Sequence, residues 1–259
     1  MRDIYKKEVK IGLNRISTQN PGIITQKDLD PLPPIVQKYL IYCGVVGKEK
    51  VFNVRMKFTG RIRTSPEEKW LPFSSEQYTF FDKPTRIFYI KASKMGLPIT
   101  GIHLYKDGTA IMKMIFAGMF TILDTKGPEL NQAETVTVFD DMCSLAPATL
   151  ISKNIQWETI DPLKVKAKFS NGKNKISAIL IFNEKGELIN VTSNDRFETN
   201  DGKIYKSCPW SAPISTYKSI NGSRIPTTAS EIFNRLDGDF SYGEFVLKEI
   251  EYNCKEYKE

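Results

Sequence analysis

The side chains that could perform acid, base or nucleophilic chemistry are few and far apart in this chain. His103 is the single histidine among 259 residues, so no site that needs two imidazoles can form. It lies in a strand-like run before Asp107-Gly108, and no G-x-S-x-G segment typical of a hydrolase occurs. His103 is therefore either a catalytic base, with partners that the sequence does not identify, or an ordinary strand histidine that forms a hydrogen bond.

Two acids and one arginine are the other polar positions that could serve a site. Asp140 and Asp141 fall in a helical pattern, where adjacent side chains point about 100° apart and do not form a shared acid/base dyad. One of them could face a pocket; alternatively, one is exposed and the other forms a cap or an ion pair. Arg196 lies in a predicted strand that runs from Leu188, and either pairs with an acid inside a cavity or lies in solvent.

Motifs for metals and cofactors are absent. The cysteines Cys43, Cys143, Cys208 and Cys254 form no C-x-x-C pair, so with one histidine no ordinary zinc, iron or copper site can be assembled. Four free buried thiols in a reducing compartment are favoured over two disulfides. Residues 44–48 lack the spacing of a phosphate-binding loop, and no dinucleotide fingerprint occurs. The sequence therefore predicts no metal and no cofactor.

The net charge of +7, from 37 basic and 30 acidic side chains, does not by itself indicate a nucleic-acid partner. The basic residues are spread along the chain. Their densest group lies in residues 164–175, where lysines alternate with apolar residues as on the solvated face of a strand. We therefore expect no binding to nucleic acid.

No segment predicts a membrane span. The longest apolar run, residues 110–123, has 14 residues and contains Lys113, which suits a buried strand or hairpin better than a bilayer. The N-terminal residues are charged and lack the apolar segment of a signal peptide. These features predict a cytoplasmic location for the chain as given, and an envelope location only if a leader has been removed.

Turn-forming dipeptides and the alternation of apolar and polar residues indicate the secondary-structure elements that must position the candidate site residues. Residues 54–58 and 163–169 alternate between apolar and polar side chains, as in half-buried strands, and residues 176–182 are apolar on both faces, as in a strand covered on both sides. We expect roughly ten antiparallel strands, linked mostly by short hairpins. Six dipeptides supply the turn signals: Asp107-Gly108, Asn171-Gly172, Lys185-Gly186, Asp201-Gly202, Asn221-Gly222 and Asp237-Gly238.

Two stretches predict helices. Residues 33–43 carry an apolar stripe and end before Gly44, and residues 132–151 are split by Pro147. No repeat or linker divides the chain, so we expect a partly helical lead-in over residues 1–30 and one domain over residues 31–259. The fold class is α+β and mainly β: a large curved antiparallel sheet, or half-barrel, with helices packed on its concave face.

An apolar pocket is expected on that concave face. A sheet of this width cannot stay flat, and two short helices would leave part of its apolar row uncovered. Met56 and Phe58 are the predicted lining, and Trp70 and Trp210, each near a proline, are the predicted rim. Arg196 completes the predicted ligand-binding set. The alternative for both tryptophans is packing in the core at strand ends.

The order of several short motifs resembles a bacterial family known as domain of unknown function 6544. Residues 32–40, with Gly44, Val45 and Gly47, match the family's opening, and the resemblance covers about residues 30–253. Lys38 replaces the usual Arg, and residues 139–143 depart from the family pattern, which weakens the transfer of any polar site around Asp140 and Asp141. The other matching pieces are Trp70-Leu71-Pro72-Phe73, the segment from Asp140 to Pro147-Ala148, Trp157, Arg196, Trp210, Tyr217-Lys218, Gly222, Pro226 and Phe240-Ser241-Tyr242.

The resemblance implies a strand layout similar to lipoprotein-carrier half-barrels, in which a curved sheet wraps helices around an apolar cavity; it implies no activity. Three functions follow. The first is a non-catalytic module that binds an apolar or amphipathic, lipid-like small molecule. The second is an enzyme with Arg196, His103 or Asp140 in the sheet cavity. The third is a structural or protein-interaction domain whose concave face is filled. An unfilled cavity, and the polar groups that converge in it, would distinguish them.

Overall fold

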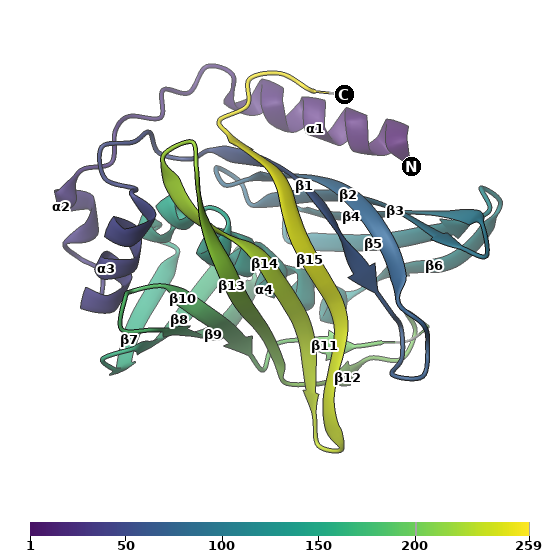
Figure 1. The fold of residues 1–259 in the computed structure, drawn as a ribbon. Helices are drawn as coiled ribbons and strands as arrows, with labels where there is room; N and C mark the ends of the chain where they lie inside the picture. Colours follow the sequence, from purple (N-terminus) through teal and green to yellow (C-terminus); the bar gives the residue numbers. More distant parts are fainter. Residues whose placement is uncertain (200, 259) are drawn as a thin grey trace.

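One large antiparallel sheet forms most of the molecule and curves around a central helix (Figure 1). The computed structural model describes residues 1–199 and 201–258. In this part of the chain, thirteen strands pair in the order β6-β5-β4-β3-β2-β1-β15-β14-β13-β10-β9-β8-β7, and β11 pairs with β12. The strands are β1 (Asn53–Ile62), β2 (Leu71–Phe80), β3 (Thr85–Lys94), β4 (Leu97–Lys106), β5 (Thr109–Phe116), β6 (Phe120–Lys126), β7 (Ile155–Asp161), β8 (Lys164–Asn171), β9 (Asn174–Phe182), β10 (Leu188–Ser193), β11 (Phe197–Glu198), β12 (Lys206–Ser207), β13 (Trp210–Ile220), β14 (Ser223–Arg235) and β15 (Gly238–Tyr252).

The predicted mainly-β fold with a large curved antiparallel sheet is confirmed, although the sheet has thirteen strands where about ten were expected. Part of the difference lies in residues 110–123, an apolar run that forms the hairpin of β5 and β6. Ala117 and Gly118 both adopt positive φ there, 52° and 71°, and turn the chain without the Asn or Asp that signals the other hairpins. Asp107-Gly108 and Asn221-Gly222 form the tight turns that their residue types predict.

Helix α4 (Pro128–Ser144) links the two ends of this sheet. It follows β6 at one edge and leads through a short 3-10 helix, η1 (Pro147–Ile151), to β7 at the other edge. It therefore crosses the concave face and contacts β4, β5 and β6 on one side and β9 and β10 on the other. The predicted break at Pro147 is confirmed, and the helix begins four residues earlier than expected, with Pro128 in its first turn.

Helices cover both faces of the sheet rather than the concave face alone. Side chains of β2 alternate, so that Gln77 and Thr79 point to α4 while Tyr78 and Phe80 point to the outer face. There they pack against helix α1 (Arg2–Ile16). Helix α3 (Pro34–Cys43) packs on the α4 side, where Tyr39 donates a hydrogen bond to the carbonyl of Cys143, and the short helix α2 (Gln26–Leu29) precedes it.

Strand β9 differs from the expectation of a strand covered on both sides. Its Ile176, Ala178 and Leu180 are buried against the α4 side, but Ile179 and Ile181 on the outer face are only half-buried. Helix α1 covers the outer face at the other half of the sheet, over β2, β3 and β4. An apolar outer row is therefore left without a helix over β9.

Candidate functional site

A cavity of about 300 Å³ lies between the first half of α4 and the concave face of the sheet. Its walls are mostly apolar, and one part carries a group of charged side chains. The apolar lining comes from β3 to β6, from α4 and from β14 and β15: Phe88, Ile90, Met112, Met114, Leu123, Leu130, Phe233, Phe240 and Phe245. The concave face is therefore not completely filled by the protein's own side chains.

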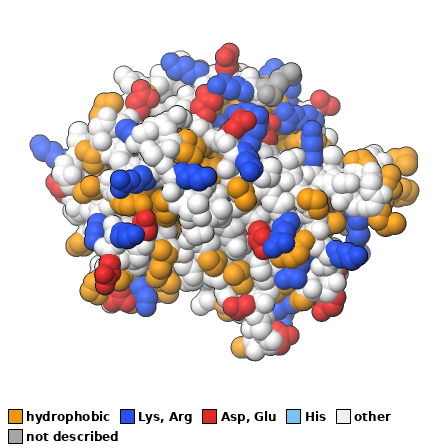
Figure 2. All heavy atoms as spheres, in the orientation of Figure 1, with side chains coloured by type: hydrophobic (Ala, Val, Ile, Leu, Met, Phe, Trp, Pro, Cys, Tyr) orange, Lys and Arg blue, Asp and Glu red, His pale blue; other side chains and the backbone are white. Residues whose placement is uncertain are grey.

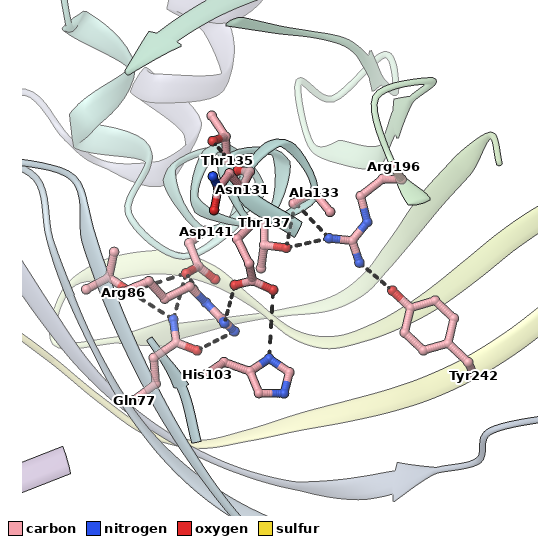
Figure 3. Close-up of polar contacts among 12 residues, drawn as sticks. Gln77, Arg86, His103, Asn131, Ala133, Thr135, Thr137, Asp141, Arg196 and Tyr242 are labelled. Carbon is pink, nitrogen blue, oxygen red and sulfur yellow. Dashed lines mark hydrogen bonds and ion pairs between the residues drawn. The ribbon is translucent and has the colours of Figure 1, made fainter. Parts of the chain in front are cut away.

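Arg86 is the centre of the charged group (Figure 3). Its Nε donates to the Asp141 carboxylate at 3.1 Å, and its two terminal nitrogens donate to Glu134 at 3.3 Å and to Gln77 Oε1 at 2.9 Å. Glu134 and Asp141 lie two turns apart on α4, so one face of the helix presents both carboxylates to the arginine. All three charged side chains are buried and are paired within the cluster.

His103 lies beside this group on β4. Its Nδ1 is 3.8 Å from Glu134 Oε1, its ring packs on Phe88, and its side chain is 22% exposed. Burial opposes the ionised form of Glu134, but His103 and the Arg86 cation outweigh burial and lower the pKa of Glu134 to about 2. Glu134 is therefore an anion whose compensating charges are already in place.

Arg196 approaches α4 from the loop after β10, which ends at Ser193. Its guanidinium donates to the carbonyl of Ala133 at 2.9 Å, to Thr137 Oγ1 at 2.6 Å and to the Tyr242 hydroxyl at 2.8 Å. It also stacks over Trp210, 5.0 Å from the ring centre. All these partners are uncharged, and Arg196 Nε is buried without a hydrogen-bond partner in the described part of the chain. Arg196 is therefore a cation in the wall of the cavity that no described carboxylate pairs through a hydrogen bond.

Two further acids, Glu231 and Asp140, lie close to Arg196. Glu231 Oε2 accepts hydrogen bonds from Trp210 Nε1 at 3.0 Å and from Tyr242 at 3.2 Å, while Asp140 Oδ1 is buried without a partner among the described residues. Burial raises the pKa of Glu231 to about 7. Burial and the neighbouring carboxylates of Glu231 and Asp141 raise the pKa of Asp140 well above its usual range. Both acids line a second, smaller cavity of about 70 Å³ that shares Arg86, Thr137, Glu231 and Phe245 with the larger one.

The residues predicted as a ligand site are not brought together at one place. Met56 is fully buried among apolar side chains of the sheet, and Phe58 lines only the small cavity. Trp70 lies between the guanidinium groups of Arg61 and Arg63, 4.7 and 4.5 Å from its ring centre.

Trp210 is 1% exposed, so its predicted place at a rim is wrong. The reason is that β13 is an inner strand of the sheet, and the indole lies under Arg196 instead of at an edge. Arg196 is the predicted residue that lines the large cavity, although it lies in a loop and not in a strand.

Arg86, Glu134, Glu231 and Tyr242 are the site residues that the sequence reading missed. One signal was present for Arg86: it is a single charge in residues 85–90, a run of β3 that is buried on both faces. Glu231 and Tyr242 gave no such signal, because they lie in long strands with mixed polar and apolar residues.

No metal site accompanies these groups. Residues 1–199 and 201–258 contain no cluster of three His, Cys, Asp or Glu side chains that could hold an ion. The four cysteines are free and buried. None of the described helices is long and apolar enough to cross a membrane.

Three solved structures are similar in fold to this chain. A DUF1329 family protein from Desulfovibrio piger is 10% identical, with a TM-score of 0.49, over 92% of this chain and 96% of that one. A protein from Vibrio parahaemolyticus, described as an outer membrane lipoprotein-sorting protein domain, is 8% identical over 86% and 93%, with a TM-score of 0.48. A LolA superfamily protein from Nitrosomonas europaea is 8% identical over 85% and 92%, with a TM-score of 0.42.

Sequence comparison gives the family. No curated protein matches the chain. The model of the family of unknown function DUF6544 matches residues 22–245, which confirms the resemblance carried by the motifs from residue 32 onward. The chain therefore belongs to the DUF6544 family of unknown function.

Proposed function

We propose that the protein is a non-catalytic module that binds an amphipathic, lipid-like molecule with an anionic head group. One observation carries the proposal: the wall of an apolar cavity of about 300 Å³ includes Arg196, a cation whose hydrogen-bond partners are all uncharged. This volume is at the lower end of the usual range for small-molecule sites, which is about 300–1,000 Å³. The apolar chain would lie against Met112, Met114 and Leu123, and the head group would lie at Arg196.

The protonation of the neighbouring acids favours an anion over a cation. Burial raises the pKa of Glu231 to about 7, so Glu231 holds a proton at lower pH, and burial and the neighbouring carboxylates raise the pKa of Asp140. A protonated carboxyl group donates a hydrogen bond, so Arg196 and Glu231, which both line the cavity, would offer donors to a carboxylate. Each nitrogen of the Arg86 guanidinium already donates to Glu134, Asp141 or Gln77, so Arg86 would support the site without binding the head group.

Calorimetry with matched twelve-carbon ligands tests this function. Dodecanoate should bind the folded protein with a Kd of about 10 µM or lower, and dodecanol and dodecyltrimethylammonium should bind at least tenfold more weakly. Met114→Trp fills the cavity and should abolish binding, whereas Leu236→Trp, in the exposed turn between β14 and β15, should leave binding unchanged. Circular dichroism verifies that both variants fold. If no apolar probe binds the folded wild type, the concave face serves only as a structural core.

Asp140 and Glu231 also favour a second candidate, an enzyme that acts on a small molecule in the cavity. A carboxyl group with a pKa near neutrality can act as a general acid or base, and Glu231 has a pKa of about 7 through burial. Native mass spectrometry of the protein purified without detergent separates the two functions. A binding module releases the ligand with unchanged mass after prolonged incubation, and an enzyme converts it.

A further inference from the structure

Two neighbouring hairpin turns expose large apolar side chains at one end of the sheet. The turn between β3 and β4 carries Met95, which is 92% exposed, and the turn between β5 and β6 carries Met119 and Phe120, which are 77% and 60% exposed. The two turns lie side by side, because the amide of Ala117 donates to the carbonyl of Pro98 at 2.8 Å. Figure 2 shows apolar side chains gathered at the end of the molecule where these hairpins project in Figure 1. We call residues 95–98 and 117–120 the hairpin tips.

The hairpin tips lie in a part of the chain that is nearly free of acids. Between residues 83 and 123 the only acid is Asp107, which lies in the β4–β5 turn at the opposite ends of these strands. Lys91 and Lys94 lie close to the tips. Lys94 is 3.6 Å from Glu68 in an exposed ion pair, which is a weak and screened interaction. On a chain of net charge +7, these lysines favour a negatively charged surface.

We propose that the hairpin tips dock the protein on an anionic lipid bilayer, with Met95, Met119 and Phe120 inserted among the head groups. Exposed apolar patches beside basic residues are typical of surfaces that bind membranes or proteins. A stable protein interface buries about 800 Å² on each partner, and two projecting turns of four residues each offer a small, convex contact in its place. A bilayer accepts such a convex contact because it has no fixed shape to match.

The same hairpin connects this surface to the cavity. Met114 on β5 and Leu123 on β6 face each other across the hairpin below its tip, and both line the cavity. A lipid-like ligand that leaves the bilayer at the tips would therefore enter beside residues that line its site. This connection rests on the proposed function, whereas docking to the bilayer does not require an occupied cavity.

Vesicle co-sedimentation tests the docking. The wild type should sediment with vesicles of three parts phosphatidylcholine to one part phosphatidylglycerol, and more weakly with pure phosphatidylcholine. The double variant M119S/F120S should bind the anionic vesicles at least tenfold more weakly. The matched control is L236S, because Leu236 is even more exposed in a hairpin turn but lies beside Asp237 and Asp239. Thermal unfolding of each variant verifies that the variants and the wild type are all folded when their vesicle binding is compared.

Fluorescence gives the position of the contact. The emission of M119W should shift to the blue with anionic vesicles and be quenched by brominated lipid, whereas that of L236W should not respond. Equal vesicle binding by M119S/F120S and the wild type, or an unresponsive M119W, would overturn the proposal. So would a wild type that is dimeric in solution and becomes monomeric on M119S/F120S substitution, because the tips would then join two copies. Met114→Trp distinguishes the two proposals: it should lose dodecanoate and still bind vesicles.

Discussion

Arg86 is held in the interior by its ion pairs to two acids of α4. Two buried carboxylates, Glu134 and Asp141, accept from one guanidinium, and removal of one member of such a group leaves the others buried without a partner. We expect Arg86→Met to lower the free energy of unfolding by about 3–5 kcal/mol at pH 7, measured by urea denaturation. Lys113→Met removes an exposed ion pair to Asp124, between β5 and β6, and should cost less than about 1 kcal/mol. Equal losses in the two variants would contradict the structural role of Arg86.

Glu231 should make stability depend on pH in the opposite sense to an ordinary ion-paired acid. Burial raises its pKa from 4.5 to about 7, so the unfolded chain loses this proton at lower pH than the folded chain. The folded state therefore loses stability as pH rises from about 4.5 to about 7, by about 3 kcal/mol, and does not recover it above that range.

Glu231→Gln keeps an acceptor for Trp210 and Tyr242 and removes the charge. At pH 8 this variant should be more stable than the wild type by about 3 kcal/mol, and at pH 4 the two should unfold at the same urea concentration. A variant that is less stable than the wild type at pH 8 would show that Glu231 is paired and ionised in the folded protein.

The sequence contained part of this residue-scale arrangement. A lone arginine near the end of a strand and two acids on a helix were visible as positions that could face a pocket. Their partners were not visible, because Arg86 and Asp141 are 55 positions apart and meet only when α4 crosses the sheet. From the sequence alone, a charged residue in an apolar strand can be either buried or exposed. The element that covers the strand decides which of the two it is.

At the scale of elements, the packing of α1 depends on a residue with no side chain. An ideal Cβ on Gly12 would lie 2.4 Å from the ring of Phe80 on β2, a distance that no relaxed contact allows. Tyr5, Val9, Leu13 and Ile16 form the rest of the buried face of this helix. Gly12→Val should therefore push α1 off the outer face of the sheet.

We expect Gly12→Val to lower the free energy of unfolding by about 1–3 kcal/mol, and to expose the lysines of α1 to trypsin under native conditions. Lys10→Val places the same side chain two residues away on the exposed side of the helix and is the matched control. If Gly12→Val resists trypsin as well as Lys10→Val does, Phe80 adjusts its position and α1 does not depend on the close contact.

Local sequence patterns predicted that α1, α3 and α4 exist. They did not predict which face of the sheet each helix covers. Residues 1–30 showed a helical tendency, but β3 is apolar on both faces over residues 87–90, so either face could receive the helix. Tight turns were predicted well where Asn or Asp precedes Gly. Residues 110–123 were left as either a strand or a hairpin, because the β5–β6 turn uses Ala117 in a conformation that is rare for its type.

At the scale of the whole molecule, the reactivity of the four cysteine thiols can show which face of the sheet becomes exposed to solvent. Cys43, Cys143 and Cys208 lie in the core on the α4 side, and Cys254 lies in the core beneath α1. Burial raises the pKa of Cys43 to about 12 and of Cys254 to about 11, so both are unreactive thiols in the folded state.

None of the four cysteines should react with Ellman's reagent within minutes in native buffer. In Gly12→Val, Cys254 should become reactive while Cys43, Cys143 and Cys208 stay protected, because only the layer beneath α1 is disturbed. Peptide mapping after labelling identifies the modified residue. Simultaneous labelling of all four would mean that the two layers unfold as one unit.

The single sheet could be predicted from turns and alternation, since most of its pairings join strands that are neighbours in the chain. A pocket on its concave face was also expected, but its position and lining could not be predicted, because they depend on how large side chains from α4, β3 and β15 fit together. Composition and alternation indicate which side chains face inward, and they do not determine the space left between them.

The pairing of β1 with β15 sets the order in which this sheet can assemble. Every other pair in the large sheet joins segments close in sequence, whereas Val54 and Tyr252 are about 200 residues apart. Closing a loop of that length costs about 5 kcal/mol of chain entropy, so the halves β1–β6 and β7–β15 should each form before they join. The large cavity draws its wall from both halves and is complete only after this last step. A partly folded chain would therefore not bind a ligand in this cavity. Refolding monitored by ligand fluorescence should lag behind refolding monitored by circular dichroism, because strand pairing within each half precedes completion of the cavity.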